Sequence, residues 1–496
     1  MVLELLHPAA LVLLAAILAP ILPRRLAHAV GLLATGAVVV LVSVIGAGAS
    51  LQTTLFAPGV VESETIGFDV VLYNVDQFSR LMGQIFGFIG AIAVLYSYSS
   101  DADSVQTGYA LSYVGVSLGA VFAGDWLTLV FFWELMAVTS TLLVWHYGGE
   151  AIRAGFRYAI VHGIGGSLLL AAIVWYAADP DTLLVFSKHV EPHATGGMSA
   201  AASSWPAILA AIGIGVNVGF VGLHTWLPDT YPRPHIAASV FLCVFTTKTG
   251  VYGMYRAFPD GHLWIAYMGG AMAVFGAFTA LLQSDMRRLL SYHIQSQVGY
   301  MIAGIGLAGA GIVESEKIAK VATAGAFGHV FNHILYKALL FMAVGVVIYR
   351  TGEQSIKKVG GLARRMPITA ITFTIAALSI AGFPGFNGFV SKGMVIKAAH
   401  EHSTELLGSE LHLIWWLLLI GGVGTFLSFI KLGYYVFLEG EYSGPVRDAN
   451  RGQSIAMVTV AGLCVFFGLV DSSLLEPLSI DLGTSEIGRA SCRERV

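Results

Sequence analysis

Long apolar stretches separated by short polar connections dominate the residue pattern of this chain. A helix needs about 20 consecutive apolar residues to cross the hydrocarbon core of a bilayer. Read with a window of that length, the sequence predicts about fourteen such segments. They lie near residues 4–22, 27–48, 78–98, 108–124, 126–146, 155–177, 205–227, 236–257, 262–283, 289–311, 322–349, 368–398, 411–438 and 453–474.

Two connections are long, residues 49–77 and 178–204, and the others leave no room for a domain outside the membrane. The first contains "GFDVVLYNVD", whose alternating pattern predicts a small surface hairpin. The first apolar run is expected to be a retained helix and not a cleaved signal peptide, because Arg24 and Arg25 follow it.

The composition points the same way. Of the 496 residues, 56% are hydrophobic and 11% are charged, whereas about 25% are charged in a typical soluble protein. Lipid tails solvate an apolar exterior that so few charges could not cover in water. The sequence therefore predicts an all-α polytopic membrane protein.

Several other classes of function lack support in the composition. The net charge of -3 indicates no nucleic-acid partner. The three cysteines are too widely separated for a disulfide framework or a metal site. No iron–sulfur, nucleotide, flavin or haem motif is present, so the sequence indicates no cofactor.

The distribution of Lys and Arg predicts the orientation, because cytoplasmic loops carry an excess of both. Loops after odd-numbered segments hold Arg24, Arg25, Arg153, Arg157, Arg233, Arg287, Arg288, Arg350, Lys357, Lys358, Arg364, Arg365, Arg447 and Arg451. The opposite loops hold only Arg80, Lys188, Arg256, Lys317, Lys320 and Lys397. We therefore expect the odd loops in the cytoplasm and both termini outside.

The final residues, "EIGRASCRERV", are basic on the side predicted to be external. We interpret residues 481–496 as a polar tail that is not native and residues 1–480 as one transmembrane domain.

Several charged residues interrupt the apolar segments. A charge in the middle of a membrane helix costs about 2.5–3.5 kcal/mol on insertion scales, so such residues face the protein interior and tend to be functional. Glu134, Lys248 and Lys392 each lie inside a predicted segment. Lys431 does too, but its aromatic surroundings leave a structural anchor and a functional role equally open.

Three ionisable residues share one predicted helix. His329, His333 and Lys337 in "FGHVFNHILYKALLF" stand four residues apart and therefore on one face. A single histidine inside a helix is usually a satisfied core residue, but three ionisable groups on one face favour a proton-carrying role.

A short internal match indicates a repeat. "KTGVY" at 248–252 and "KLGYY" at 431–435 agree at three of five positions. Each follows a segment broken by Pro and Gly, "HTWLPDTYPRP" and "AGFPGFNGF". Segments 4–8 and 9–13 are then two five-helix units, about residues 108–257 and 262–438, with broken helices 7 and 12.

Five motifs carry a family resemblance: "HTWLPDTYP", "TTKTGVY", "DMRRLLSYHIQSQVGYM", "FNHILYKALLF" and "GFPGFNGFVSKG". Together they resemble the antiporter-type subunits of respiratory complex I and of Mrp cation/proton antiporters, over nearly everything from segment 3 to segment 13. "TTKTGVY" and the overall length are most similar to the D-type Mrp subunit. The resemblance implies about fourteen helices with two inverted five-helix repeats.

The resemblance also implies roles in proton translocation. Glu134 matches a helix 5 glutamate that modulates a lysine on helix 7, and Lys248 matches the central lysine of helix 8. Lys392 matches the charged outlet residue of broken helix 12. The face formed by His329, His333 and Lys337 matches the helix 11 link between two half-channels. Further candidate relay residues are His293, His224, Asn217 and Lys431.

One position departs from the family pattern. The helix 7 lysine should stand nine residues before Trp226, where this chain has Asn217. Asparagine can hydrogen-bond a carboxylate but cannot carry a proton's charge. Without that cation, Glu134 should be protonated more often, unless it has another cationic partner.

Three functions fit the sequence. The first is a proton-translocating subunit of a multisubunit Mrp-type Na⁺(K⁺)/H⁺ antiporter, with other membrane subunits, protons and Na⁺ or K⁺ as partners. The second is a proton-pumping membrane subunit of a complex I-like NADH-quinone oxidoreductase or a membrane-bound hydrogenase. The third is a non-pumping membrane partner of a soluble protein in inorganic-carbon uptake. In each case the chain itself is not an enzyme and lies in the cell (inner) membrane.

Overall fold

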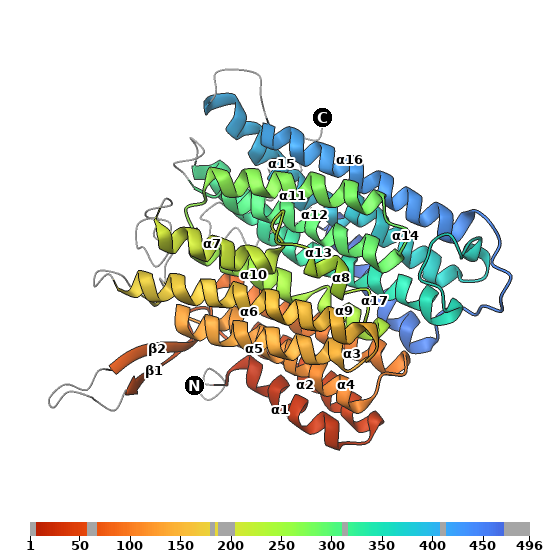
Figure 1. The fold of residues 1–496 in the computed structure, drawn as a ribbon, viewed down its shortest axis with the longest axis horizontal. Coiled ribbons are helices and arrows are strands. Elements are labelled where there is room, and N and C mark those ends of the chain that lie inside the picture. Colours follow the sequence, from red (N-terminus) through yellow and green to blue (C-terminus); the bar gives the residue numbers. More distant parts are fainter. Residues whose placement is uncertain are drawn as a thin grey trace.

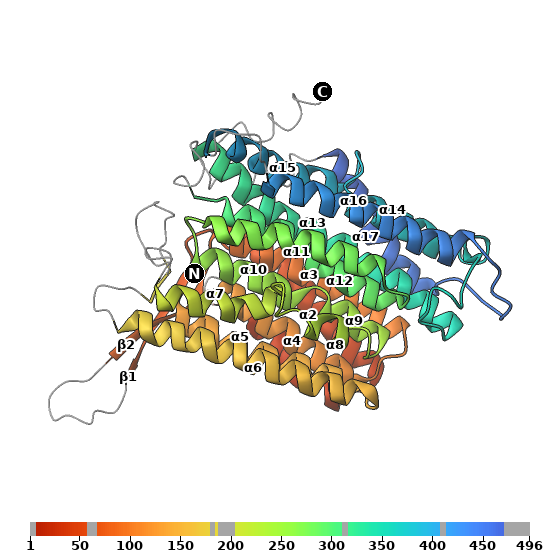
Figure 2. The same cartoon turned by 45° about the horizontal axis from the view of Figure 1, so that its top comes forward.

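A bundle of helices that run roughly along one common direction makes up the computed structural model (Figure 1, Figure 2). It describes residues 6–56, 67–178, 184–186, 204–309, 316–406 and 413–470. The proposed non-native tail, 481–496, and the end of the last predicted segment lie outside the described residues.

The helices follow the predicted segments along the chain. The first half contains α1 (Pro8–Leu18), η2 (Ala19–Ile21), α2 (Arg24–Val44), α3 (Gln77–Ser99), α4 (Ser104–Phe122), α5 (Trp126–Trp145), α6 (Glu150–Ala177), α7 (Trp205–Val218), α8 (Trp226–Thr230), α9 (Ile236–Leu242) and α10 (Phe245–Ala257). The second half contains α11 (Leu263–Leu281), α12 (Met286–Gly306), α13 (Glu316–Thr351), η4 (Leu362–Arg364), α14 (Pro367–Ala381), α15 (Asn387–Leu406), α16 (Leu413–Gly433), the π-helical η5 (Tyr434–Leu438) and α17 (Arg451–Leu469).

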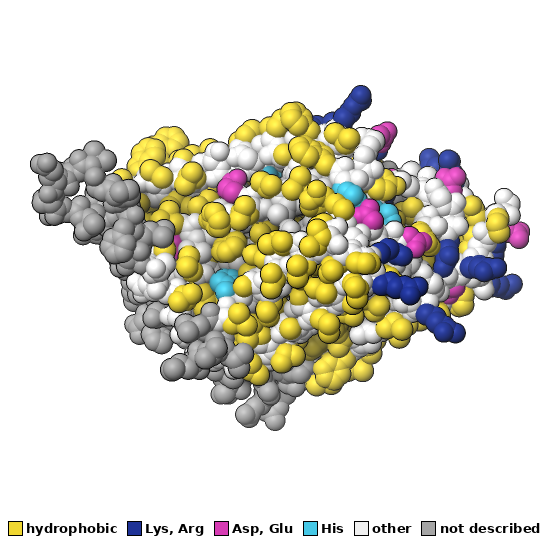
Figure 3. All heavy atoms as spheres, turned by 90° about the horizontal axis from the view of Figure 1, so that it is seen from below, with side chains coloured by type: hydrophobic (Ala, Val, Ile, Leu, Met, Phe, Trp, Pro, Cys, Tyr) yellow, Lys and Arg dark blue, Asp and Glu magenta, His cyan; other side chains and the backbone are white. Residues whose placement is uncertain are grey.

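Nine of the described helical spans are long and apolar enough to cross a membrane, as judged from length and composition. Every predicted apolar segment overlaps one helix or a broken pair of helices. On the face seen in Figure 3, apolar side chains cover much of the surface, and Lys and Arg side chains gather at one end. The prediction of an all-helical polytopic membrane protein is confirmed.

The predicted hairpin is also present. Strands β1 (Ser50–Phe56) and β2 (Gly67–Asn74) pair antiparallel, with Ser50 opposite Asn74 and an irregularity between Leu51 and Gln52. The hairpin projects from one end of the bundle (Figure 1), and the Lys and Arg side chains gather at the opposite end (Figure 3).

Both predicted helix breaks occur, and they share one geometry. Helix α7 ends at Gly219 and α14 ends at Gly382, with left-handed φ angles of 77° and 78°. In each case the next amide reaches back five residues: Phe220 donates to the Gly215 carbonyl at 2.9 Å and Phe383 to the Leu378 carbonyl at 3.0 Å. This is the Schellman ending that glycine favours at a helix C-terminus.

A third break was not predicted. The segment 236–257, which we expected to be continuous, divides into α9 and α10 at Cys243 and Val244. Side chains replace the lost backbone bonds: the Thr246 amide donates to the Tyr113 hydroxyl at 2.9 Å, and the Lys248 ammonium donates to the Cys243 carbonyl at 2.6 Å. Such replacement is required because backbone groups at membrane depth find no water in lipid.

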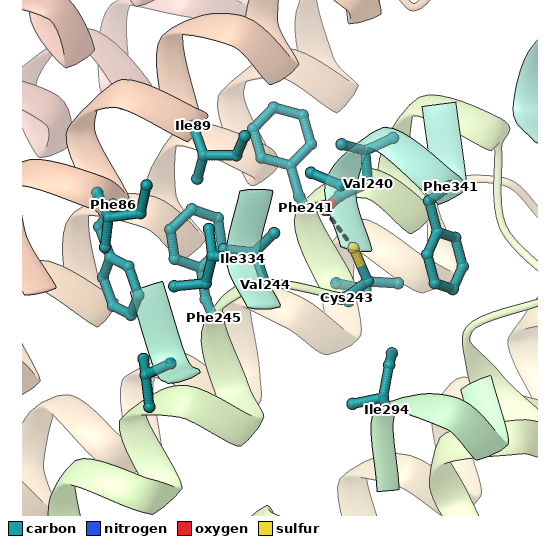
Figure 4. Close-up of a cluster of buried hydrophobic side chains, with 14 of the residues drawn as sticks. Phe86, Ile89, Val240, Phe241, Cys243, Val244, Phe245, Ile294, Ile334 and Phe341 are labelled. Carbon is teal, nitrogen blue, oxygen red and sulfur yellow. Dashed lines mark hydrogen bonds between the residues drawn. The ribbon is translucent and has the colours of Figure 1, made fainter. Parts of the chain in front are cut away.

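Buried hydroxyls hold this third break in place. Thr246 Oγ1 lies 2.5 Å from the Tyr113 hydroxyl and 3.3 Å from that of Tyr158, which lies 2.9 Å from Ser140 Oγ. Apolar side chains from α3, α9, α12 and α13 pack around the same break (Figure 4). The break is therefore fixed by tertiary contacts among α4, α5, α6 and α10.

Helix α13 runs through the interior of the bundle. It packs against α3, α9, α12, α14, α15 and α17. Nearly all of its apolar span is buried. The ionisable face predicted on this segment therefore lies inside the protein.

The left-handed ending of α14 predicts a specific stability loss. Gly382→Ala should lower the free energy of unfolding by about 1–2 kcal/mol, because an alanine side chain disfavours positive φ. The measurement is thermal unfolding of the purified protein in detergent. Gly393→Ala is the matched control, since this helical glycine of α15 has open space around it and alanine favours helix. Equal melting temperatures for the two variants would contradict the prediction.

A second prediction concerns the hydroxyl groups that hold the α9–α10 break. Thr246→Val removes the hydroxyl shared with Tyr113 and Tyr158 and should cost about 1 kcal/mol of unfolding free energy. Thr249→Val on the same helix should be neutral or stabilising, because Thr249 Oγ1 is buried without a hydrogen-bond partner in the described structure. The same thermal unfolding assay compares the two. A loss at Thr249→Val as large as that at Thr246→Val would show that valine itself, and not the lost hydroxyl, destabilises this helix.

Candidate functional site

Lys248 lies at the third helix break. Its side chain is wholly buried in α10. The ammonium donates to the Cys243 carbonyl at 2.6 Å and to Thr247 Oγ1 at 3.0 Å. The break thus supplies a carbonyl at the negative end of α9, where a cation is stabilised.

Lys392 has an equivalent setting in the second half. Its side chain is 4% exposed, and its ammonium donates to the Ile380 carbonyl at 2.5 Å, where α14 ends. The same nitrogen lies 4.8 Å from the centre of the Tyr300 ring, a cation–π contact. Two of the predicted lysines therefore each bind a carbonyl released by a broken helix.

The predicted face of α13 lies between these two lysines in sequence and is completely buried. His329 has a partner at each ring nitrogen: Nδ1 lies 3.0 Å from Ser391 Oγ and Nε2 lies 3.2 Å from the Tyr336 hydroxyl. In contrast, neither the ring nitrogens of His333 nor the Lys337 ammonium has a hydrogen-bond partner in the described structure.

Hydrogen bonds between neutral polar side chains connect this face of α13 to the neighbouring helices α12, α15 and α16. Tyr336 donates to Gln297 on α12 at 3.5 Å, and Gln297 donates to Thr425 on α16 at 3.3 Å. On the other side, Asn332 donates to Ser391 at 3.2 Å and to the Asn387 carbonyl of α15 at 2.8 Å. These residues were not predicted from the sequence, although "FNH" and "FNGFVSK" place both asparagines beside the charged positions.

His293 joins this region from α12. It is wholly buried, and neither ring nitrogen has a hydrogen-bond partner within the described ranges. Its ring lies 4.8 Å from the ring of Phe429, and the Lys337 ammonium lies 6.0 Å from the centre of the same ring. His293 and Lys337 therefore flank one aromatic ring.

In the first half of the chain, two of the predicted site residues, Glu134 and Asn217, lack partners among the described residues. Glu134 is half-buried on α5, and its carboxyl group packs against Gly166 of α6, where any side chain would overlap it. No Lys, Arg or His of the described structure pairs with it. Asn217 is buried, and its amide oxygen and nitrogen also lack hydrogen-bond partners there. The described residues therefore provide no cationic partner for Glu134 in place of the expected helix 7 lysine.

One histidine was not singled out from the sequence. His162 on α6 is buried between the rings of Tyr158 and Trp226, at 3.9 and 4.4 Å, and lies one helical turn before Gly166. Its Nδ1 lies 3.0 Å from the Tyr158 carbonyl, whereas Nε2 has no partner in the described residues. The sequence around His162 did not indicate a functional residue, because a single histidine in an apolar helix is usually a core residue.

The two remaining relay candidates have other partners. His224 lies in the broken part of segment 7, where its Nδ1 accepts from the Gly222 amide at 3.3 Å. Lys431 is half-buried and donates to the Leu281 and Gln283 carbonyls, at 2.7 and 2.8 Å, at the end of α11. These contacts favour the structural interpretation of Lys431.

We call the set formed by Lys248, His329, His333, Lys337, Lys392 and His293 the buried polar line. Charge on one member raises the electrostatic cost of charge on the next, because burial weakens solvent screening. Groups without fixed hydrogen bonds, such as Lys337 and His333, are free to change partners when they gain or lose a proton. Across the described residues, no cluster of His, Cys, Asp and Glu is arranged to hold a metal ion.

The chain is similar to a known protein family and to curated proteins whose functions are named. Residues 123–427 match the family described as "NADH:quinone oxidoreductase/Mrp antiporter, TM". The chain is 28% identical over 453 residues to Na⁺/H⁺ antiporter subunit A1 of Staphylococcus aureus, a match that covers 85% of this chain and 55% of the relative. The chain thus spans about half the length of the curated relatives that it matches.

Solved structures share the fold over almost the whole chain. A chain of the membrane-bound sulfane sulfur reductase, an archaeal respiratory membrane complex, matches with a TM-score of 0.80 and 26% identity, over 96% of this chain and 77% of that one. A chain of the Mrp complex from Dietzia sp. DQ12-45-1b matches at 0.79 and 21%, over 97% and 96%. A chain of respiratory complex I from Thermus thermophilus matches at 0.79 and 19%, over 97% and 99%.

The last two likenesses, below 25% identity, concern the fold alone. The family match covers the larger part of the chain, including the breaks and the whole buried polar line. The expected likeness to the D-type Mrp subunit in particular stays a prediction, because the relative described above is an A1 subunit. This chain is a member of the membrane-subunit family that NADH:quinone oxidoreductases and Mrp antiporters share.

Proposed function

We propose that this chain is the proton-translocating subunit of a multisubunit Mrp-type Na⁺(K⁺)/H⁺ antiporter. The observation that carries the proposal is the buried polar line itself. Burying unpaired ionisable groups in a membrane protein is costly and has no packing benefit, so such groups are retained for transport. The similarity to Na⁺/H⁺ antiporter subunit A1 supports the antiporter assignment.

In the proposed mechanism, protons pass along the line by changes of charge on neighbouring groups. Lys248 and Lys392 hold the ends of the line, and His329, His333 and Lys337 connect them through α13. A proton that arrives at one group repels charge from the next, and the weak screening inside the protein makes this coupling effective. A neutral lysine still donates two hydrogen bonds, so Lys248 can keep its contact with Cys243 in both states.

The two proposed repeats, about residues 108–257 and 262–438, then carry one half-channel each. Glu134 serves the first and Lys392 the outlet of the second. Asn217 replaces the expected lysine of the first, so the entry route there depends on Glu134 and its surroundings. The half-buried position of Glu134 suits contact with a neighbouring membrane subunit.

We further propose that the protein lies in the cell (inner) membrane with its basic end in the cytoplasm and both termini outside. The gathering of Lys and Arg at one end of the bundle supports this orientation (Figure 3). The proposed partners are other membrane subunits, the lipid bilayer, protons, and Na⁺ or K⁺.

One observation favours a second candidate, a proton-pumping subunit of a redox complex. The sulfane sulfur reductase chain covers 96% of this protein at 26% identity. In that case the redox chemistry resides on other chains of the complex. The third candidate, a non-pumping membrane partner of a soluble protein, draws support from Asn217 alone.

Lys248→Ala should abolish proton/cation exchange in membrane vesicles that contain the whole antiporter complex, because it removes the charge-carrying group at one end of the line. Exchange is measured as the collapse of a proton gradient on addition of Na⁺ or K⁺. Assembly is checked by co-purification of the other subunits. Lys431→Ala is the control and should keep most of the exchange, since Lys431 binds carbonyls at the end of α11. Full exchange in Lys248→Ala vesicles would refute the proposed route.

Asn217→Lys should create dependence on Glu134. The added cation pairs with the carboxylate, so Glu134→Ala should slow exchange more in the Asn217→Lys background than in the natural one. We expect a coupling of about 1 kcal/mol or more, which is roughly a fivefold difference in rate. The four combinations are compared in the same vesicle assay. If Glu134→Ala is harmless in both backgrounds, Glu134 plays no part in transport.

A further inference from the structure

A pocket at the basic end of the bundle lies apart from the buried polar line. Its volume is about 680 Å³, and it is lined by Tyr349, Arg350, Arg365, Pro445, Val446 and Arg447. These residues come from three separate places: the end of α13, the turn before α14 and the loop before α17. Folding therefore brings three arginines to one cavity.

The positive charge of this pocket is not neutralised within the described structure. Arg350, Arg365 and Arg447 take part in none of the ion pairs found there. The lining of the pocket contains no carboxylate. Three guanidinium groups therefore face one cavity without a counter-charge among its walls.

Two acidic side chains beside the pocket lining, Asp448 in sequence and Asp101 in space, are already engaged. Asp448 accepts hydrogen bonds from the backbone amides of Ile368 and Thr369 at the start of α14. Asp101 accepts from the Tyr349 hydroxyl and pairs with Arg24.

The arginines differ in how firmly they are held. Arg365 donates to the Tyr442 and Gly444 carbonyls at 2.6 and 2.5 Å, which fixes it against the loop before α17. The Arg350 guanidinium stacks on the Tyr349 ring at 5.1 Å, and its Nε is buried without a hydrogen-bond partner in the described residues. A buried donor without a partner carries a free-energy cost, so the Arg350 guanidinium is not fully satisfied by the described residues.

We propose that this pocket binds a phosphate group. Guanidinium groups present a planar fork that matches the oxygens of phosphate with two parallel hydrogen bonds. Arg350 and Arg447 supply the free donors, and Arg365 adds a fixed positive charge. A phosphate of this kind belongs to an anionic phospholipid headgroup or to a soluble ion. The basic end of a membrane protein meets both. The proposal is independent of the transport function.

The test uses the full-length protein purified in detergent and three probes: phosphatidylglycerol, phosphatidylcholine and inorganic phosphate. Binding is followed by native mass spectrometry for the lipids and by the rise in melting temperature for inorganic phosphate. The test variant is Arg350→Gln with Arg447→Gln. The control is Arg153→Gln with Arg288→Gln, which removes the same charge from two exposed arginines near the starts of α6 and α12.

We expect the test variant to bind phosphatidylglycerol or inorganic phosphate about tenfold more weakly than the natural protein, and the control to bind it normally. Phosphatidylcholine, whose choline cation neutralises its phosphate, should bind equally to all three proteins. A selective loss with phosphatidylglycerol assigns the pocket to a lipid headgroup, whereas a loss with inorganic phosphate alone assigns it to a soluble anion. Equal binding by the test variant and the natural protein, or equal loss in the control, overturns the proposal. If the double variant does not fold, Arg447→Gln alone tests it, because this side chain is exposed.

Discussion

Carbonyl groups released by broken helices are the constraint on which the interior of this protein depends. Lipid offers no water to such groups, so the protein itself must supply a donor for each. Lys248 donates to Cys243 at the end of α9, and Lys392 donates to Ile380 at the end of α14. The same two ammonium groups thus complete the fold and provide the ionisable positions of the proposed route. The same hydrogen bonds therefore stabilise the fold and hold the side chains of the proposed route.

The two halves of the protein meet this constraint differently. In the second half, hydrogen bonds connect Gln297, Tyr336, His329 and Ser391 and reach α15. In the first half, hydroxyl groups of Tyr113, Tyr158 and Thr246 hold the α9–α10 break, while Asn217 has no partner in the described structure. The second half therefore has a continuous polar connection, and the first half has a well-held break beside an unconnected amide.

Residues that are costly in their surroundings could be predicted from the sequence. Lys248 and Lys392 were found because a charge stands out in an apolar segment, and the breaks at Gly219 and Gly382 because Gly and Pro interrupt helices. The break after α9 was missed because its sequence contains neither residue, and its partner Tyr113 lies 133 residues away from Thr246. Neutral polar groups such as Tyr336 and Ser391 were missed for a related reason. Their cost in a membrane helix is small, so only the packed structure reveals the network.

The incomplete first half bears on why the proposed transport belongs to an assembly of subunits. Glu134 is half-buried and has no cationic partner in the described residues. An unpaired carboxylate at membrane depth is unfavourable, so Glu134 is either protonated or neutralised by a cation outside the described residues. His162, one helical turn before Gly166 on α6, stacks on the ring of Tyr158. Within the proposed route, a neighbouring membrane subunit is the proposed source of such a cation, and this contact would link proton entry in this chain to its partners.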